Sequence, residues 1–281
     1  MRCKNTCTIF VLLLAMLLVW PVFAAAGESS GRNGEIKKGI TAEASCAIVG
    51  MSAEQSQLTA LQRARATAIE QAAGVSITSA TLVTNYTVAA DFIKTYSRGF
   101  IVAEKVTWLP LGQYQKNKST PPIPEYHVKI EADVYIPSRK EKAIGLKANL
   151  NNVVFRAGEK AKVTIRTKST AKIALFNIMD DDTVALLFPN TYEPDNNIAA
   201  GKDFVFPAKD AKVEIEMQTL PGHKKDAEAI FVIAWDAGRE IDIMQQFVPG
   251  ESIPTSVFFS KLSEIIDQCE DAILPYEVVA K

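Results

Sequence analysis

The sequence predicts a β-rich chain with an α+β N-terminal domain, an all-β sandwich and a C-terminal amphipathic helix. Three observations support this fold class. In residues 40–137, segments that alternate apolar and polar residues flank two helical stripes. In residues 142–240, short apolar segments recur about every 8 to 12 residues between turn signals. In residues 254–281, apolar residues return at helical spacing.

The first 26 residues have the pattern of a secretory signal peptide. Arg2 and Lys4 precede a short apolar run, and the small residues Ala24, Ala25 and Ala26 follow it. The run is shorter than the roughly 20 apolar residues that a spanning helix needs, although an uncleaved anchor is the alternative. We expect cleavage after Ala24 or Ala26, a periplasmic protein, and no membrane span afterwards.

The remaining chain, about 255 residues long, is expected to begin with a flexible lead-in at 27–39, which is rich in Gly and Ser. Two of the 31 basic residues and none of the 32 acidic residues lie in the signal segment, which leaves a net charge of −3. The sequence has no basic run with interleaved aromatic residues, so nucleic acid is a poor candidate partner.

In residues 40–137, a strand at 40–48 precedes a helix that Ser52 and Gln55 begin with a capping box and Gly74 ends. The polar face of this helix, with Arg63, Arg65 and Glu70, is expected in solvent. A shorter helix is expected around 88–96. Strands at 100–108 and 126–136 then form an antiparallel ribbon across a polar loop at 112–124.

The run from Ala60 to Val75, followed by Asn85, Asp91-Phe92-Ile93 and Ser97-Arg98-Gly99-Phe100-Ile101, resembles the N-terminal domain of the flagellar assembly T-ring proteins. It is also similar to small envelope lipoproteins built on the same module. The resemblance covers about 95 residues, and it implies a structural role in a periplasmic assembly without catalytic residues.

Residues 142–240 are expected to form the β-sandwich, an accessory domain. The expected strands are 143–150, 161–167, 172–178, 183–188, 203–206, 211–217 and 229–235. The sequence from Phe155 through Leu-Leu-Phe-Pro-Asn at 186–190 to Gly201 resembles a bacterial domain family of unknown function. Such domains look like accessory or recognition units.

A recognition loop is therefore a candidate binding site. It consists of Pro189, Asn190, Asp195, Asn196 and Gly201. A rigid scaffold that holds such a loop is where binding residues usually lie. The alternative is that Asp195, Asn196 and Gly201 only stabilise their own turns.

The C-terminal helix is expected from its apolar stripe, which runs from Phe258 through Leu262 and Ile266 to Cys269, with a short tail after Pro275. Cys46 and Cys269 are expected to be two separate, buried, reduced thiols. A disulfide between them is the alternative, because an exported protein meets an oxidising compartment.

The sequence shows no catalytic or metal-binding constellation. His127 and His223 are interpreted as surface residues, and neither has an evident second zinc ligand near it. The acidic run Asp180-Asp181-Asp182, with Glu193, Asp195 and Asn196, offers oxygen ligands for calcium without the EF-hand spacing. We therefore expect no cofactor and no metal.

The expected function is that of a non-enzymatic exported envelope protein, acting as an adaptor, an assembly factor or a binding module with an envelope protein partner. The alternative is a periplasmic carboxylate-dependent hydrolase or carbohydrate-active enzyme. Two carboxylates in one deep pocket would favour that alternative.

We predict that the protein recovered from the periplasmic fraction starts at Ala25 or Gly27, because a signal peptidase cleaves after small residues. Intact-mass measurement of that protein checks this. A chain that retains Met1 and sediments with membranes would show that the segment is an anchor.

Overall fold

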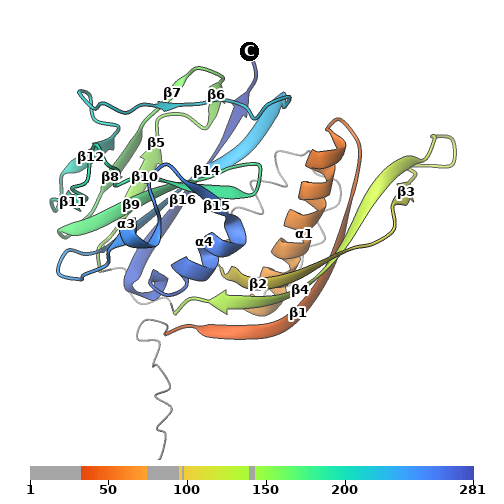
Figure 1. Cartoon of the computed structure of the whole chain (residues 1–281), viewed down its shortest axis with the longest axis horizontal. Coiled ribbons are helices and arrows are strands. Elements are labelled where there is room, and N and C mark those ends of the chain that lie inside the picture. Colours follow the sequence, from red (N-terminus) through yellow and green to blue (C-terminus); the bar gives the residue numbers. More distant parts are fainter. Residues whose placement is uncertain (1–32, 75–94, 97, 139–142) are drawn as a thin grey trace, which may run out of the picture. The chain divides into compact units, whose positions relative to one another are not determined.

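The computed structural model describes residues 33–74, 95–96, 98–138 and 143–281 (Figure 1). The expected signal peptide and most of the helix expected at 88–96 lie outside these residues. Within them, strands dominate and form several sheets, which confirms a β-rich fold. The described part of the chain contains no helix with the length and apolar character needed to cross a bilayer.

The N-terminal sheet has the order β1-β4-β2 and is antiparallel throughout. Its strands are β1 (Glu35–Ala47), β4 (Ile123–Ile136) and β2 (Phe100–Trp108). The pairing of β2 with β4 confirms the expected ribbon. Strand β1 starts earlier than predicted, so residues 35–39 belong to the sheet and not to a flexible lead-in. The polar loop is also shorter than predicted, because β3 (Gly112–Tyr114) extends the ribbon.

Helix α1 (Ala53–Ala73) begins and ends as the sequence predicts. Ser52 and Gln55 form the capping box, and Gly74 closes the helix at a φ of 71°. The helix packs on β1 and β4. Four of its buried residues are alanines spaced four apart along one face: Ala60, Ala64, Ala68 and Ala72. These small side chains let the helix axis lie close to the sheet.

The large sheet has the order β15-β10-β9-β14-β16-β6, and β11 (Asn197–Ile198) pairs with β9. Its strands are β15 (Ser252–Pro254), β10 (Thr183–Phe188), β9 (Ala171–Ile178), β14 (Lys225–Asp236), β16 (Cys269–Val279) and β6 (Val154–Arg156). A second sheet has the order β12-β8-β5, made of β12 (Asp203–Phe206), β8 (Val163–Arg166) and β5 (Lys147–Leu150). A short pair joins β7 (Lys160–Ala161) to β13 (Ile215–Glu216).

The central strands β9 and β14 are buried on both faces, because the large sheet has a hydrophobic cluster on each side. Ile173, Leu175 and Val232 belong to the cluster that also holds residues of β8 and β12. Phe176 and Phe231 belong to the other cluster, which continues into α1 and the N-terminal sheet. Burial on both faces explains why these strands are continuous apolar runs.

The helix predicted for the C-terminal segment is wrong in its extent. Helix α4 spans only Thr255–Leu262, and the chain then enters a 3₁₀ turn and the long strand β16. Cys269, expected at the end of the helical stripe, is the first residue of β16. The tail expected after Pro275 is also part of this strand, which pairs along its whole length with β14.

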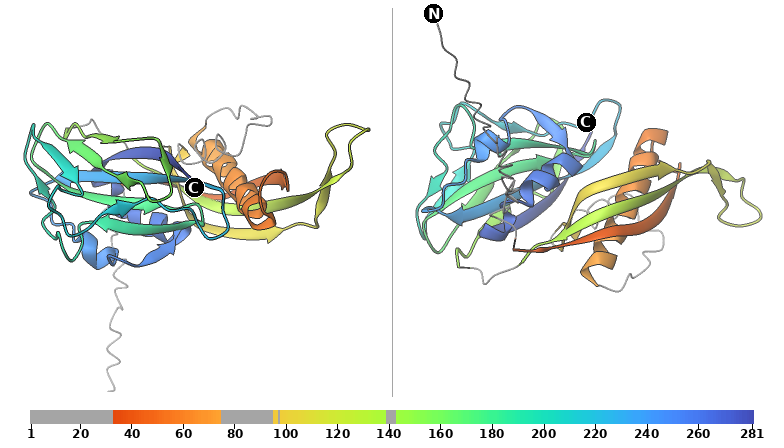
Figure 2. Two further views of the ribbon diagram at one scale, coloured as in Figure 1. Left: turned by 90° about the horizontal axis from the view of Figure 1, so that it is seen from above. Right: turned by 60° about the horizontal axis from the view of Figure 1, so that its bottom comes forward.

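Helix α4 lies between the large sheet and the N-terminal sheet (Figures 1 and 2). The Phe259 ring stacks on Phe100 of β2, with 4.9 Å between ring centroids. The neighbouring Phe258 ring meets Phe176 of β9, also at 4.9 Å. Both phenylalanines are fully buried. The helix therefore contributes to one core that both sheets share.

Two carboxylates of the C-terminal segment hold distant backbone. Asp267 accepts hydrogen bonds from the Gly34 and Ser138 amides at 2.8 and 2.9 Å, and from the Tyr135 hydroxyl. Glu270 accepts from the amides of residues 144, 145 and 146. These bonds flank the predicted domain boundary at 137–142. The boundary itself lies mostly outside the described residues, so the division into domains at 40–137 and 142–240 stays a prediction.

Arg65 was expected in solvent but is buried in two ion pairs. Its guanidinium binds Glu104 of β2 through two nitrogens, at 2.5 and 3.0 Å, and Asp182 after β9 at 2.6 Å. The carboxylates raise the pKa of Arg65, which therefore stays charged. One side chain of α1 thus joins both sheets.

Cys46 and Cys269 are both free, as expected, but only Cys46 has the expected burial. Cys46 is buried, whereas Cys269 is partly exposed and donates to the Ile265 carbonyl at 3.4 Å. Burial raises the pKa of the Cys46 thiol, and it raises the pKa of Cys269 to about 12.

We predict that Arg65→Met lowers the free energy of unfolding by about 3 to 5 kcal/mol, because it leaves Glu104 buried without a counter-ion. Urea denaturation measures this. The control is Arg98→Met, which breaks a more exposed pair with Glu70 and should cost no more than about 1 kcal/mol. Equal losses in the two variants would contradict the structural role of Arg65.

Candidate functional site

Pairing of β9 with β14 brings together residues that lie far apart in the sequence. The pairing of the two strands ends at Ile178 and Ala229, and beyond these residues both segments continue toward the same end of the sheet. Asp180 follows β9. His223 lies in the turn before β14, and Asp226 is in the first part of that strand. The antiparallel register therefore places Asp180 beside the His223–Asp226 hairpin.

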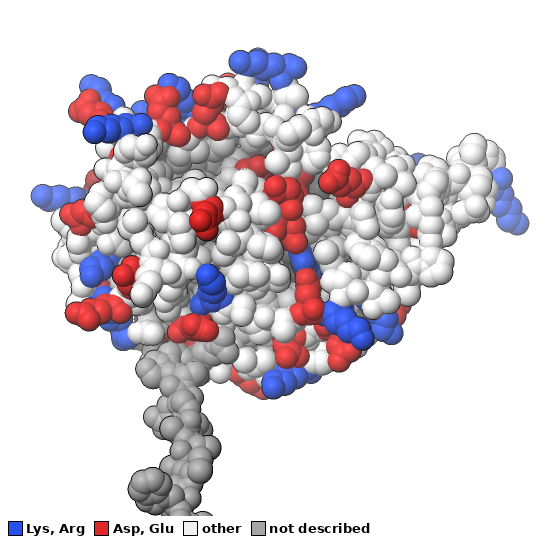
Figure 3. All heavy atoms as spheres, in the orientation of Figure 1, with Lys and Arg blue, Asp and Glu red and all other residues white. Residues whose placement is uncertain are grey.

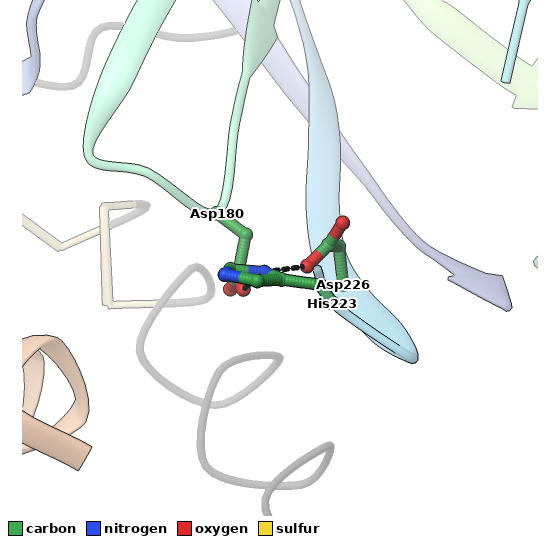
Figure 4. Close-up of side chains that lie close together, drawn as sticks. All are labelled: Asp180, His223 and Asp226. Atoms are coloured by element: carbon green, nitrogen blue, oxygen red, sulfur yellow. Dashed lines mark hydrogen bonds and ion pairs between the residues drawn. The ribbon is translucent and has the colours of Figure 1, made fainter. Parts of the chain in front are cut away.

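The three side chains converge (Figure 4). His223 Nδ1 lies 2.5 Å from Asp226 Oδ1 and 3.8 Å from Asp180 Oδ2. One nitrogen and two carboxylate oxygens thus lie within 4.8 Å of one another.

Asp226 is the fixed member of this cluster. Its side chain is completely buried. Its second oxygen, Oδ2, accepts a hydrogen bond from the Leu220 amide at 2.5 Å. That bond spans the Pro221-Gly222 turn and fixes the orientation of the carboxylate.

Asp180 carries an unfavourable charge. Burial, repulsion from Asp226 and a hydrogen bond shared with Asp226 raise its pKa to about 7, although nearby His223 acts in the opposite direction. The cluster is therefore short of positive charge.

A second polar network links β16, β14 and β9 near the same end of the sheet. The Tyr276 hydroxyl of β16 is 2.5 Å from Glu228 Oε2 and 2.7 Å from Asn177 Oδ1. Asn177 Nδ2 also donates to Glu228 Oε2, at 3.0 Å. Burial raises the pKa of Glu228, whereas the hydrogen bonds from Tyr276 and Asn177 act in the opposite direction. This network adds to the negative character of the end of the sheet.

A cavity of about 490 Å³ opens beside the cluster. The first turns of α1 form one wall, which includes Ser52, Gln55 and Thr59. Asp180 and the hairpin residues Gly222, Lys224 and Lys225 form the other. The cavity therefore lies between α1 and the large sheet, and Asp180 is the member of the cluster that reaches it.

The predicted recognition loop does not join this site. Asn190 is buried and its side chain accepts from the Tyr192 and Glu193 amides, both at 2.9 Å. Asp195 accepts from Asn197, and Asn196 donates to the Ile173 carbonyl. Pro189 follows Phe188 through a cis bond, and Gly201 has a φ of 71°. These bonds stabilise the loop's own turns, so recognition by this loop stays a prediction.

The acidic residues considered as calcium ligands are distributed among separate contacts. Asp181 accepts from Thr183, Asp182 pairs with Arg65, and Asp195 binds Asn197. Asp180 alone belongs to the three-residue cluster. His127, interpreted as a surface residue, is partly exposed and lies 3.1 Å from Glu125.

The interpretation of His223 needs correction. Its side chain is mostly buried, with 15% exposed, and Asp226 follows it by three residues. The pattern Pro-Gly-His-x-x-Asp is present in the sequence, and it pairs an imidazole with a carboxylate across a turn. The contribution of Asp180 was not visible, because it depends on the register of two strands.

Residues 154–230 match the model of a domain of unknown function, DUF4384. The match begins at β6 and ends within β14, and it includes Asp180, His223 and Asp226. It leaves out β16, α4 and the N-terminal sheet. No curated protein matches the sequence.

We predict that Asp180→Asn makes the protein more stable at pH 8, by an amount on the order of a few kcal/mol, in buffer with a chelator. The folded pKa of about 7 lies above the ordinary 3.8, so the folded state binds the extra proton between these values. The stability from this group is present below about pH 4 and is lost as the pH rises to about 7.

Urea unfolding at several pH values measures this effect, and Asp180→Asn should flatten the slope. Asp210→Asn, a change at an exposed acid of the same domain, serves as the control and should keep the wild-type slope. An unchanged slope in Asp180→Asn would contradict the assignment.

Proposed function

We propose that this chain is an exported, non-enzymatic envelope protein that acts as a binding module and recognises another envelope protein through its N-terminal ribbon. The observation that carries this proposal is a group of exposed apolar side chains at one end of the N-terminal sheet. We call Val49, Trp108, Leu109 and Leu111 the ribbon patch.

All four residues lie around the same short part of β4. Trp108 is opposite Val128, and the Leu109 amide binds the His127 carbonyl. Gly112, next to Leu111, pairs with Glu125, and the Ile48 amide binds the Pro124 carbonyl. Pairing with β4 therefore brings together patch residues from two segments of the chain, Val49 and residues 108–111.

The ribbon patch exposes considerable apolar area. Leu111 is 58% exposed, Val49 is 51% and Trp108 is 40%. On the face that Figure 3 shows, the projecting ribbon has few charged side chains, with Lys or Arg near its tip. Exposed apolar groups with a polar rim are typical of protein interaction surfaces. Trp108 provides the aromatic anchor that such surfaces often use.

The proposed setting is the periplasm, where the signal pattern of residues 1–26 would deliver the chain. The resemblance of residues 60–101 to T-ring and envelope lipoprotein modules supports a role in an envelope assembly. With it we propose the finer architecture: an α+β domain at 40–137 with a second helix near 88–96, followed by the sandwich domain.

A carboxylate-dependent hydrolase is the second candidate function, favoured by Asp180 with its raised pKa beside the cavity. The position of Asp226 argues against it, because its buried side chain does not line the cavity and offers substrate no second carboxylate. Hydrolysis of an envelope polysaccharide that Asp180→Asn abolishes would favour the enzyme.

The test places a photo-crosslinking amino acid at Leu111 in cells that express the full chain. We expect one discrete adduct with an envelope protein, and we expect its loss when Trp108→Asp is added, because a charge at the anchor opposes burial. Val205→Asp is the matched control, since Val205 is about as exposed as Trp108 and lies on β12, in a different sheet.

Three outcomes would contradict the proposal. Equal yields from a crosslinker at Leu111 and one at Val154, an exposed residue of β6, would show that the ribbon patch is not selective. An adduct of two identical chains would make the patch a self-association surface. Flotation of the purified protein with anionic phospholipid vesicles, lost in Trp108→Asp, would make it a membrane contact.

A further inference from the structure

The cluster of Asp180, His223 and Asp226 has the composition and placement of a metal site. It joins one imidazole nitrogen to two carboxylate oxygens, all within 4.8 Å. Such a set suits a divalent first-row transition metal, because imidazole selects these ions and carboxylates complete the coordination. We propose that Asp180, His223 and Asp226 bind one divalent transition-metal ion, with Zn²⁺ as the representative ion.

The protein orients these ligands before an ion arrives. His223 and Asp226 belong to one tight hairpin, and its turn is closed by a hydrogen bond from the His223 amide to the Leu220 carbonyl at 3.0 Å. The Leu220 amide holds Asp226 Oδ2, which leaves Oδ1 directed at the imidazole. Hydrogen-bond partners of this kind orient the side chains that coordinate a metal and tune the affinity of the site for the ion.

The charge of the cluster favours a cation. Asp180 and Asp226 repel one another, and Glu228 adds to the negative potential at Asp180. Among the described residues, His223 is the basic group paired with either aspartate. Lys225, which lines the same cavity, pairs with Glu277. A metal ion binds Nδ1 only when this nitrogen carries no proton, so binding would release any proton held there.

The site has an entrance and room for further ligands. Asp180 lines the 490 Å³ cavity, whereas Asp226 is buried behind it. An ion that enters from the cavity meets Asp180 first and then the His223–Asp226 pair. Three protein ligands leave at least one position open to water or to a bound molecule. This inference does not depend on the ribbon patch.

The alternative is a cluster that only stabilises the hairpin through hydrogen bonds. The chain offers a matched control for separating the two, since its other histidine, His127, lies beside a single carboxylate, that of Glu125. A nonspecific histidine site would respond to substitution of either residue. The proposed site responds only to substitution of His223.

The test titrates the purified, chelator-treated protein with Zn²⁺ by calorimetry. We expect one ion per chain, with an affinity that His223→Gln and Asp180→Asn each weaken at least about 10-fold, since even indirect partners of metal ligands contribute that much. His127→Gln should bind as the wild type does. Ca²⁺ should not compete at equal concentration, because a nitrogen ligand disfavours it.

A second measurement uses the unaltered chain and so does not depend on how a variant folds. Zn²⁺ at a large excess over its dissociation constant should raise the melting temperature of the wild type and of His127→Gln, and a chelator should reverse the rise. Absence of stoichiometric binding would overturn the proposal. It would also fail if His223→Gln bound Zn²⁺ with wild-type affinity, or if His127→Gln lost the site.

Discussion

The burial of the adjacent Phe258 and Phe259 of α4, which meet different neighbours, is the constraint on which the rest of the structure depends. Consecutive residues of a helix point in different directions. Phe259 reaches Phe100 and Tyr96, while Phe258 meets Phe176, Phe231 and Phe247. A helix of eight residues thereby fills the space between two sheets. The Arg65 ion pairs and the carboxylates of Asp267 and Glu270 reinforce the same junction.

This packing shows that the segment matching the family model does not form its core from its own residues alone. Residues 154–230 include strands of both sheets of the sandwich, but they leave out β5 and end within β14. The pairing partner β16 and the covering helix α4 come from outside the match. In this chain the matched segment therefore relies on neighbouring sequence to bury one face of its central strands. The cavity also depends on this neighbouring sequence, because α1 provides one of its walls.

Local signals predicted much of the fold. The capping box and Gly74 determined α1, and the strands β2, β10 and β12 have the predicted limits. The error at the C terminus has a physical cause. A short apolar stripe fits either a helix or a buried strand, and periodicity alone does not separate them. Pro275 suggested an end, yet it lies within β16 opposite Ala229. Arg65 was misplaced because its partners, Glu104 and Asp182, are distant in sequence.

The site was less predictable than the fold. His223 and Asp226 are three residues apart across a tight turn, so the local sequence is sufficient to pair them. Asp180 lies 43 positions before His223, and only the register of β9 against β14 brings it near. The acidic run at 180–182 suggests one shared cation site, whereas in the structure each of its residues has a different partner. Composition identifies candidate ligands, but topology selects among them.

The late position of β16 has a consequence for how the chain is made. Synthesis proceeds from the N terminus, and Asp267 and Glu270 are made long after the backbone near residues 34 and 144 that they hold. Until then β14 lacks one neighbour and Phe100 and Phe176 lack their cover. Contacts of such long sequence separation form slowly and leave apolar surface exposed meanwhile. Until β16 and α4 have been made, the earlier strands therefore keep this apolar surface uncovered, and the growing chain needs protection from aggregation.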